Sequence, residues 1–181
     1  MPNRYILIVP VPEQTQLLLR NTYKQVTDRA LPIQHLHISI LHPFFLKQDR
    51  TEEELYEALR RINIAPFTAS YSSVGVYHQH DKKILHITLQ PQDKFSQLHQ
   101  KSLESIQDYI DFDKAPFTGG IIPTFDPHIS LDYDWKGDAL AFAHLQGNAF
   151  NIQSLDVKKE EDGNWNTTQS FQLVPQTNRT T

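Results

Sequence analysis

The sequence contains no cysteine, and this absence removes several classes of chemistry. Thiolate zinc sites, dithiol redox pairs and cysteine nucleophiles all need the missing side chain. Without disulfides the fold has to be stabilised by a packed core, for which a chain of 181 residues is long enough. A chain without cysteine also fits a reducing compartment, so we expect a cytoplasmic protein.

Long apolar runs and an excess of positive charge are missing as well. The first apolar run covers only Tyr5 to Val9 and stops at Pro10, which is too short for a signal sequence or a membrane span. The net charge is −4, with acidic and basic residues interspersed, so nothing resembles the basic surface that grips a long nucleic acid. We expect no membrane contact and no long nucleic-acid groove, whereas a small phosphate ligand is compatible with this composition.

The sequence does have a regular succession of strand and helix patterns. Apolar periodicity predicts strands at 4–12, 33–41 and 126–134, two strands within 67–91, and a closing hairpin within 148–174 that turns at Asp162-Gly163. The same reasoning predicts helices at 13–26, 51–62, 93–110 and 137–147. Thr51 and Glu54 form a capping box at the start of the second helix. A loop around Gly119-Gly120 precedes the third single strand.

Three of these strand segments contain the pattern His-x-Ser/Thr-apolar. They read LHISIL at 36–41, LHITLQ at 85–90 and PHISLDYD at 127–134. Residues i and i+2 of a strand point to the same side, so each segment presents an imidazole beside a hydroxyl group. The question is which of His37, His86 and His128 carry chemistry.

An internal repeat separates the three patterns. Residues 7–19 align with residues 86–98 as strand, proline and helix, with Pro12 and Pro91 at equivalent places 79 positions apart. Each half then reaches a strand with His-Ile-Ser, at His37 and at His128. On this alignment His86 lies in the opening strand of the second repeat and corresponds to Leu7, which suggests a packed or substrate-contacting residue instead of a catalytic one.

Two His-x-Ser units that face each other provide what a phosphodiester displacement needs. One imidazole can remove a proton from the attacking oxygen while the other gives a proton to the leaving oxygen near neutral pH. The hydroxyl groups of Ser39 and Ser130 can donate hydrogen bonds to the non-bridging oxygens as charge develops there. We expect no metal and no cofactor in this mechanism.

The paired motifs resemble those of the 2H phosphoesterases, which include RNA 2′,3′-cyclic phosphodiesterases (also called 2′-5′ RNA ligases) and plant and yeast cyclic phosphodiesterases. HISI at 37–40 and HISL at 128–131 match the two motifs, and the segment containing Trp165 looks like the family's last hairpin. Many bacterial members place an arginine soon after the second motif, where this chain has Asp132 and Tyr133. The second motif therefore looks closer to the plant and yeast type.

The resemblance implies an α+β fold with a bilobal, duplicated β-α-β core, in which antiparallel sheets line a central cleft and helices lie outside. We expect one domain at 1–175, a loose tail at 176–181, and a monomer. The resemblance implies that His37, Ser39, His128 and Ser130 are catalytic. Candidate substrate contacts are His42, Phe44, His86 and Tyr133.

The expected function is hydrolysis of a cyclic or 2′,5′-linked phosphodiester in a small nucleotide or short oligonucleotide. Candidate substrates are nucleoside 2′,3′-cyclic phosphates, ADP-ribose 1″,2″-cyclic phosphate and signalling oligonucleotides. Two alternatives stay open at this point. One is a non-catalytic nucleotide-binding module that keeps the cleft, and the other is a histidine-based zinc protein, for which His78-x-His80 is the best local pattern.

Overall fold

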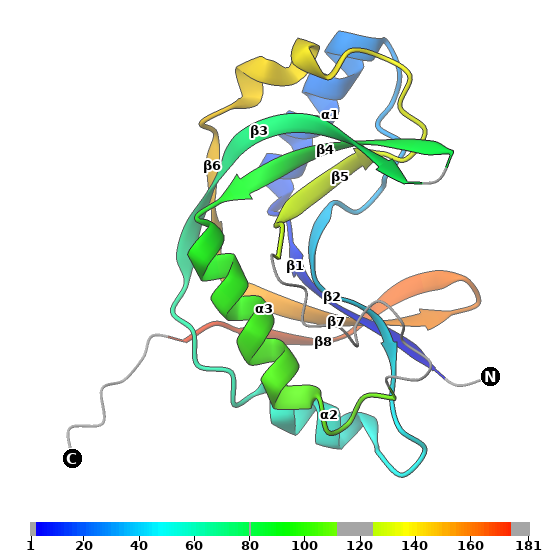
Figure 1. The fold of residues 1–181 in the computed structure, drawn as a ribbon, viewed down its shortest axis with the longest axis vertical. Helices are drawn as coiled ribbons and strands as arrows, with labels where there is room; N and C mark the ends of the chain where they lie inside the picture. The colour runs from blue at the N-terminus through cyan, green and yellow to red at the C-terminus, as the bar shows by residue number, and fades with distance from the viewer. Residues whose placement is uncertain (1–2, 80, 112–124, 175–181) are drawn as a thin grey trace.

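A computed structural model describes residues 3–79, 81–111 and 125–174 of the chain. Its centre is one antiparallel sheet of eight strands in the order β6-β3-β4-β5-β2-β1-β7-β8 (Figure 1). The strands are β1 (Arg4–Pro10), β2 (His37–Phe45), β3 (Phe67–Gln79), β4 (Lys82–Gln90), β5 (His128–Asp132), β6 (Ala149–Ile152), β7 (Ser154–Glu161) and β8 (Asn164–Gln172). The helices are α1 (Glu13–Thr27), α2 (Glu52–Leu59), α3 (Gln92–Ile106) and the 3₁₀ helix η2 (Ala139–Leu145).

The sheet consists of two halves of four strands, which we call lobe 1 (β2, β1, β7 and β8) and lobe 2 (β5, β4, β3 and β6). Between the lobes, β2 and β5 share the single residue pair Ile38 and Ile129. Figure 1 shows the sheet curled so that the two lobes face each other. The α+β class and the bilobal arrangement are confirmed, except that the two expected sheets are halves of one. The predicted loop around Gly119-Gly120 and the predicted tail 176–181 lie outside the described residues.

The duplication predicted from the sequence is visible in how the strands pair. In lobe 1, Ile8 pairs with Ser39 and Pro10 pairs with His37. In lobe 2, His86 pairs with Ser130 and Thr88 pairs with His128. The counterpart of His86 is therefore Ile8, and the assignment to Leu7 is wrong by one residue. Aligning the two prolines missed this shift because it lies between the strand and the helix.

Each repeat places its helix against the opposite lobe. The α1 residue Tyr23 packs against Trp135 and Phe142, which follow β5 in lobe 2. In the second repeat, α3 packs against β2 and α2, and its His99 donates a hydrogen bond from Nδ1 to the Ile40 carbonyl at 2.6 Å. The two helices therefore cover the outside of the sheet and hold the lobes together, although only one residue pair joins the strands at the boundary.

The predicted helix start and hairpin turn are confirmed in atomic detail. Thr51 accepts a hydrogen bond from the Glu54 backbone, and the Glu54 side chain accepts one from the Thr51 backbone, which completes the capping box of α2. Asp162 and Gly163 both have positive φ values, 51° and 78°. Such a pair forms the type I′ turn that suits a tight hairpin, and it connects β7 to β8.

One boundary in the closing segment differs from the prediction. The residues 148–174 were expected to form a single hairpin, yet β6 pairs with β3 in lobe 2 whereas β7 pairs with β1 in lobe 1. Only Gln153 separates β6 from β7. Since no glycine or proline marks this change of lobe, the pattern of apolar residues runs through it without interruption.

Candidate active site

A cleft of about 750 Å³ lies between the lobes and contains both predicted His-Ser pairs. His37 and Ser39 line it from lobe 1, and His128 and Ser130 line it from lobe 2. The other residues in its lining are Arg4, Ile6, Ile33, His42, Pro43, Tyr77, His78, Gln79, Ile84, Tyr133 and Trp165. The structure thus brings together the four side chains that the sequence singled out as catalytic.

The two central strands explain why these side chains meet. Ile38 and Ile129 are fully buried and form the residue pair that joins β2 to β5. Because neighbouring residues of a strand point to opposite faces, the histidine and serine on either side of each isoleucine point into the cleft. The antiparallel register places His37 beside Ser130 and Ser39 beside His128. Each imidazole therefore has a hydroxyl from the other lobe as its neighbour.

Both cleft histidines have one ring nitrogen held by the backbone. Nδ1 of His37 lies 3.1 Å from the His35 carbonyl, and Nδ1 of His128 lies 2.8 Å from the Asp126 carbonyl. A carbonyl oxygen can only accept, so each Nδ1 carries the proton of the hydrogen bond. This leaves Nε2 of both rings as the atom that can take or give a proton in the cleft.

The two histidines differ in their electrostatic surroundings. Burial lowers the pKa of His37, and the positive charge of Lys158 lowers it further, together with His128, whereas the hydrogen bond to the His35 carbonyl acts in the opposite direction. Lys158 pairs with Ile6, which lines the cleft, so both side chains lie on the cleft face of lobe 1. A lowered pKa favours neutral His37, the form that accepts a proton.

A bulge after each His-Ser unit brings one further side chain to the cleft. In lobe 1 the pairing with β1 shifts between Ser39 and Leu41, and both Ile40 and Leu41 are buried. His42 then lies on the cleft side. Burial lowers the pKa of His42, and so do His128 and His99.

Lobe 2 contains the equivalent irregularity. The pairing with β4 shifts between Ser130 and Asp132, and both Leu131 and Asp132 are buried. Tyr133 then lines the cleft, 48% exposed. His42 and Tyr133 each follow the histidine of their own unit by five residues. They are equivalent positions of the duplicated fold. Both residues are among the predicted substrate contacts, and both line the cleft.

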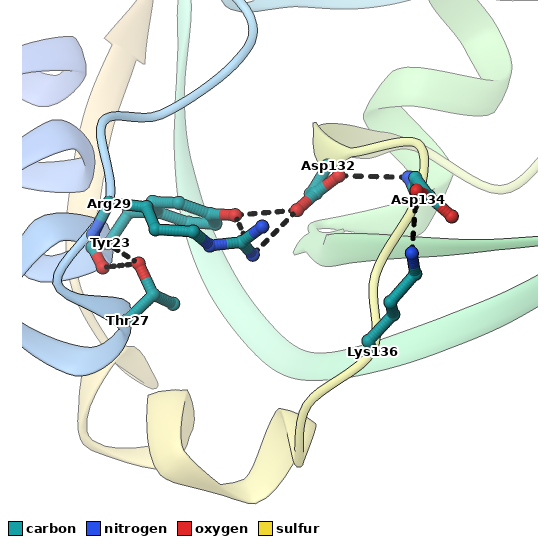
Figure 2. Close-up of polar contacts among 6 residues, drawn as sticks. All are labelled: Tyr23, Thr27, Arg29, Asp132, Asp134 and Lys136. Atoms are coloured by element: carbon teal, nitrogen blue, oxygen red, sulfur yellow. Dashed lines mark hydrogen bonds and ion pairs between the residues drawn. The ribbon is translucent and has the colours of Figure 1, made fainter.

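The bulge in lobe 2 leaves Asp132 buried and outside the cleft lining. Figure 2 shows its carboxylate directed at Tyr23 and Arg29. One oxygen of its buried carboxylate accepts a hydrogen bond from the Tyr23 hydroxyl at 2.5 Å and lies 3.4 Å from the Arg29 guanidinium. The other oxygen accepts one from the Asp134 backbone at 2.8 Å. Burial and the Asp132 carboxylate raise the pKa of Tyr23 to about 12. Asp132 therefore connects α1 of repeat one to β5 of repeat two, the strand that contains His128 and Ser130.

Two of the predicted substrate contacts do not line the cleft. Phe44 is fully buried, pairs with Tyr5 and packs against its ring at 6.0 Å, because a second shift in the β1–β2 register turns it into the core. His86 is 5% exposed and is not part of the cleft lining. Its ring lies under Tyr77, with ring centres 3.6 Å apart and planes 1° apart.

Lys158 and Arg4 were missed by the sequence analysis, although the alternation along β7 gives a signal for Lys158. In β7, the buried residues Leu155 and Val157 alternate with Lys158, so its side chain has to leave the core. Arg4 lies 5.1 Å from the ring of Trp165 and 3.1 Å from the Glu160 carboxylate.

Among the described residues, no three histidine, aspartate or glutamate side chains converge into a metal-binding group. His80 of the His78-x-His80 pattern lies outside the described residues.

Comparison with known protein families gives one match that covers most of the chain. The model of the 2′-5′ RNA ligase superfamily matches residues 11–158. No curated protein sequence matches the chain significantly. Within the described part of the chain, no helix is long and apolar enough to cross a membrane.

Several solved structures share the fold at low sequence identity. TT0787 of Thermus thermophilus matches with a TM-score of 0.70 and 21% identity, covering 96% of this chain and 100% of that one. LigT of E. coli matches with a TM-score of 0.63 and 16% identity over 95% of this chain and 98% of that one. Usb1 of Kluyveromyces marxianus, solved with uridine monophosphate, reaches 0.52 and 13% over 95% and 98%. LigT has also been solved with 3′-AMP, phosphate, NADP⁺ and ATP.

Proposed function

The chain belongs to the 2′-5′ RNA ligase superfamily, and on this premise we propose that it is a metal-independent phosphodiesterase that hydrolyses a cyclic or 2′,5′-linked phosphodiester of a small nucleotide. The observation that supports this proposal is the joint position of His37 and His128. They come from different lobes, line one cleft, and both have Nδ1 held by a backbone carbonyl. Two such groups on one substrate are what concerted acid-base catalysis at phosphorus requires.

In the proposed reaction, His37 is the general base and His128 is the general acid. Nε2 of neutral His37 takes a proton from water as the water oxygen bonds to phosphorus. The bond from phosphorus to the ribose oxygen breaks, and protonated His128 gives its Nε2 proton to that oxygen. The lowered pKa of His37 favours the neutral form that a base needs. A cyclic phosphate and water thus become one phosphomonoester.

The charge that develops on the non-bridging oxygens needs donors already in place. The Ser39 and Ser130 hydroxyls lie beside the opposite histidines and can donate to these oxygens. Lys158 contributes positive charge from the cleft face of lobe 1. These groups do the work that solvent would do in water, but they need no reorganisation during the reaction.

The size and charge of the cleft support a small substrate. A volume of about 750 Å³ is in the usual range for small-molecule sites. Arg4 is the only lysine or arginine in the lining formed by the described residues, and it is already paired with Glu160. A long polynucleotide needs several unpaired cations along its backbone. The nucleotides held by LigT and Usb1 are of the size that we propose here.

The decisive experiment incubates the purified protein with EDTA and a panel of substrates. The panel contains nucleoside 2′,3′-cyclic phosphates, ADP-ribose 1″,2″-cyclic phosphate, and 2′,5′- and 3′,5′-linked dinucleotides, and the products are separated by chromatography. We expect turnover of at least one cyclic or 2′,5′-linked compound. If every compound binds and none is hydrolysed, the protein is instead a nucleotide-binding module. Activity that EDTA abolishes and zinc restores would overturn the metal-independent mechanism.

A further inference from the structure

The remaining motif, His86-x-Thr88 on β4, lies next to His128-x-Ser130 on β5 without lining the cleft. His86 pairs with Ser130 and therefore lies on the same face of the sheet as His128. The ring centres of His86 and His128 are 5.8 Å apart, with planes at 77°. Tyr77 covers His86 on the cleft side and itself lies 5.1 Å from His128 at 78°. Two parallel rings thus stand edge-on to the imidazole of His128.

The position of His86 excludes a direct catalytic role. Its Nδ1 lies 3.4 Å from the Ile84 carbonyl. Its Cε1 and Nε2 lie over Gly75, so close that a Cβ added there would be 3.2 Å and 3.4 Å away. Neither ring nitrogen points freely into the cleft. Burial lowers the pKa of His86, and the neighbouring His128 adds to this effect, so the ring stays neutral near pH 7.

Tyr77 is held by Asp126, the same residue that holds His128. Its hydroxyl donates a hydrogen bond to the Asp126 carboxylate, while the Asp126 carbonyl accepts from Nδ1 of His128. Burial, followed by this hydrogen bond, raises the pKa of Tyr77, so the phenol stays protonated and keeps donating. Asp126 therefore connects the stacked pair and the catalytic imidazole through its side chain and its backbone.

We propose that Tyr77 and His86 are positioning residues for His128. The stacked pair limits rotation of the His128 ring about χ2, and the Asp126 carbonyl selects the tautomer in which Nδ1 is protonated. Nε2 then stays directed at the substrate. In lobe 1 the register puts Ile8 in the place of His86, and within the described residues no aromatic ring packs against His37. The stacked pair is therefore a feature of lobe 2 and has no equivalent beside His37 in the described part of lobe 1.

The proposal rests on the proposed function where it concerns turnover, but its first test does not. In ¹⁵N NMR spectra recorded above the imidazole titration range, we expect His128 of the wild type to show one tautomer, with Nδ1 protonated. His86→Ala should show an average of both tautomers, and His86→Phe, which keeps a flat ring under Tyr77, should restore the single one. The signals of His37 should stay the same in all three proteins.

The second test uses kinetics with the substrate that the panel identifies. His86→Ala should lower kcat by roughly 10-fold with little change in KM, because a misdirected Nε2 slows proton transfer without weakening binding. His86→Phe should recover most of this loss. Gly75→Ala, which pushes the His86 ring through the contact at 3.2 Å, should lower kcat in the same way. Gly75→Ala also provides the test if His86→Ala does not fold.

A matched control separates positioning from stability. Phe67 lies on β3 like Tyr77, but its ring packs against Phe95 of α3 at 5.1 Å. Phe67→Ala should lower the melting temperature and leave kcat unchanged. An unchanged His128 tautomer in His86→Ala overturns the proposal, and so does a rise in KM alone or a loss of stability alone. If the wild type hydrolyses none of the compounds, the proposed function fails, while the NMR result still decides on the positioning role.

Discussion

The two lobes surround their histidines with different side chains at equivalent positions. The pairing of β1 with β7 and of β4 with β3 makes Lys158 the counterpart of Tyr77, since they pair with the cleft residues Ile6 and Ile84. The counterpart of His86 is Ile8. Lobe 1 therefore places a cation near its imidazole, and lobe 2 places two aromatic rings there. A duplicated scaffold has kept both histidines but given them different environments.

This difference suits two different tasks in one reaction. Positive charge and burial near His37 favour the neutral base, because both raise the cost of adding a proton. The stacked pair of Tyr77 and His86 instead controls the orientation of the His128 ring. The lesson is that matching sequence motifs can have different surroundings, and variants in matched positions of the two lobes can test whether their roles also differ.

The largest effect is expected from removing either imidazole. His37→Ala and His128→Ala should each lower kcat by roughly 10²- to 10⁴-fold, the usual contribution of a positioned acid or base. The double variant should lose less than the product, because the two groups act in one step. Steady-state kinetics with thermal melts measures both quantities. His144→Ala, at an exposed site on η2, is the control. Full activity in either single variant would contradict the two-lobe mechanism.

The serine variants should have the next largest effect. Ser39→Ala and Ser130→Ala each remove one hydroxyl donor to the non-bridging oxygens, so kcat should fall roughly 10- to 1,000-fold with the fold intact. Comparing the two values shows which lobe carries more of the developing charge. Turnover near the wild-type rate in both variants would mean that the hydroxyls serve only the structure of the strands.

Lys158→Met tests the electrostatic side of the comparison. Lys158 lowers the pKa of His37, so its removal should raise that pKa. The wild-type profile of kcat/KM should be bell-shaped, and its acidic limb reports the base. That limb should therefore move to higher pH in Lys158→Met, with kcat/KM at its maximum reduced by roughly 2- to 10-fold.

The adjacent lysine provides the control for this experiment. Lys159 lies on the opposite face of β7, where its ammonium group is 2.7 Å from the Glu52 carboxylate. Lys159→Met should lower stability and leave both limbs of the profile in place. If both lysine variants shift the acidic limb equally, the effect is one of net charge and not of the lobe 1 site.

The smallest effect on catalysis is expected at Asp132. Asp132→Asn weakens the contacts with Tyr23 and Arg29 and should cost about 1–3 kcal/mol in the free energy of unfolding, measured with urea. The value of kcat should barely change, because the side chain points away from the cleft. Asp134→Asn is the control, because Asp134 forms an exposed ion pair with Lys136. It should change the free energy of unfolding by less than about 1 kcal/mol. A large loss of kcat in Asp132→Asn would assign this carboxylate to the active site.

Much of the fold and the central site could be predicted because both depend on simple periodicity. Alternation on β2 and β5 was sufficient to place His37 with Ser39 and His128 with Ser130 on one face. Phe44 was assigned to the wrong side because register shifts along β2 change which residues face the cleft. Such shifts are set by the pairing with a neighbouring strand, and that neighbour is not visible in a local pattern.

Contacts between distant segments were the other part that the sequence could not supply. The stack of Tyr77 on His86 needs the hairpin register and the missing side chain of Gly75. The contribution of Lys158 needs β7 to pair with β1, which lies almost at the other end of the chain. Pattern analysis identified the strands that carry these residues, but not their order in the sheet.

The order of strands in the sheet also has a consequence for synthesis on the ribosome. All strands of lobe 2 come from residues 67–152, which lie between β2 and β7 of lobe 1. Lobe 2 can therefore pair its own strands while β1 still waits for β7 and exposes an open edge. The lobe 1 side of the cleft is completed last, when β7 with Lys158 and β8 with Trp165 have been synthesised. A translational pause between residues 152 and 154 would prolong the period in which this edge can pair with another nascent chain.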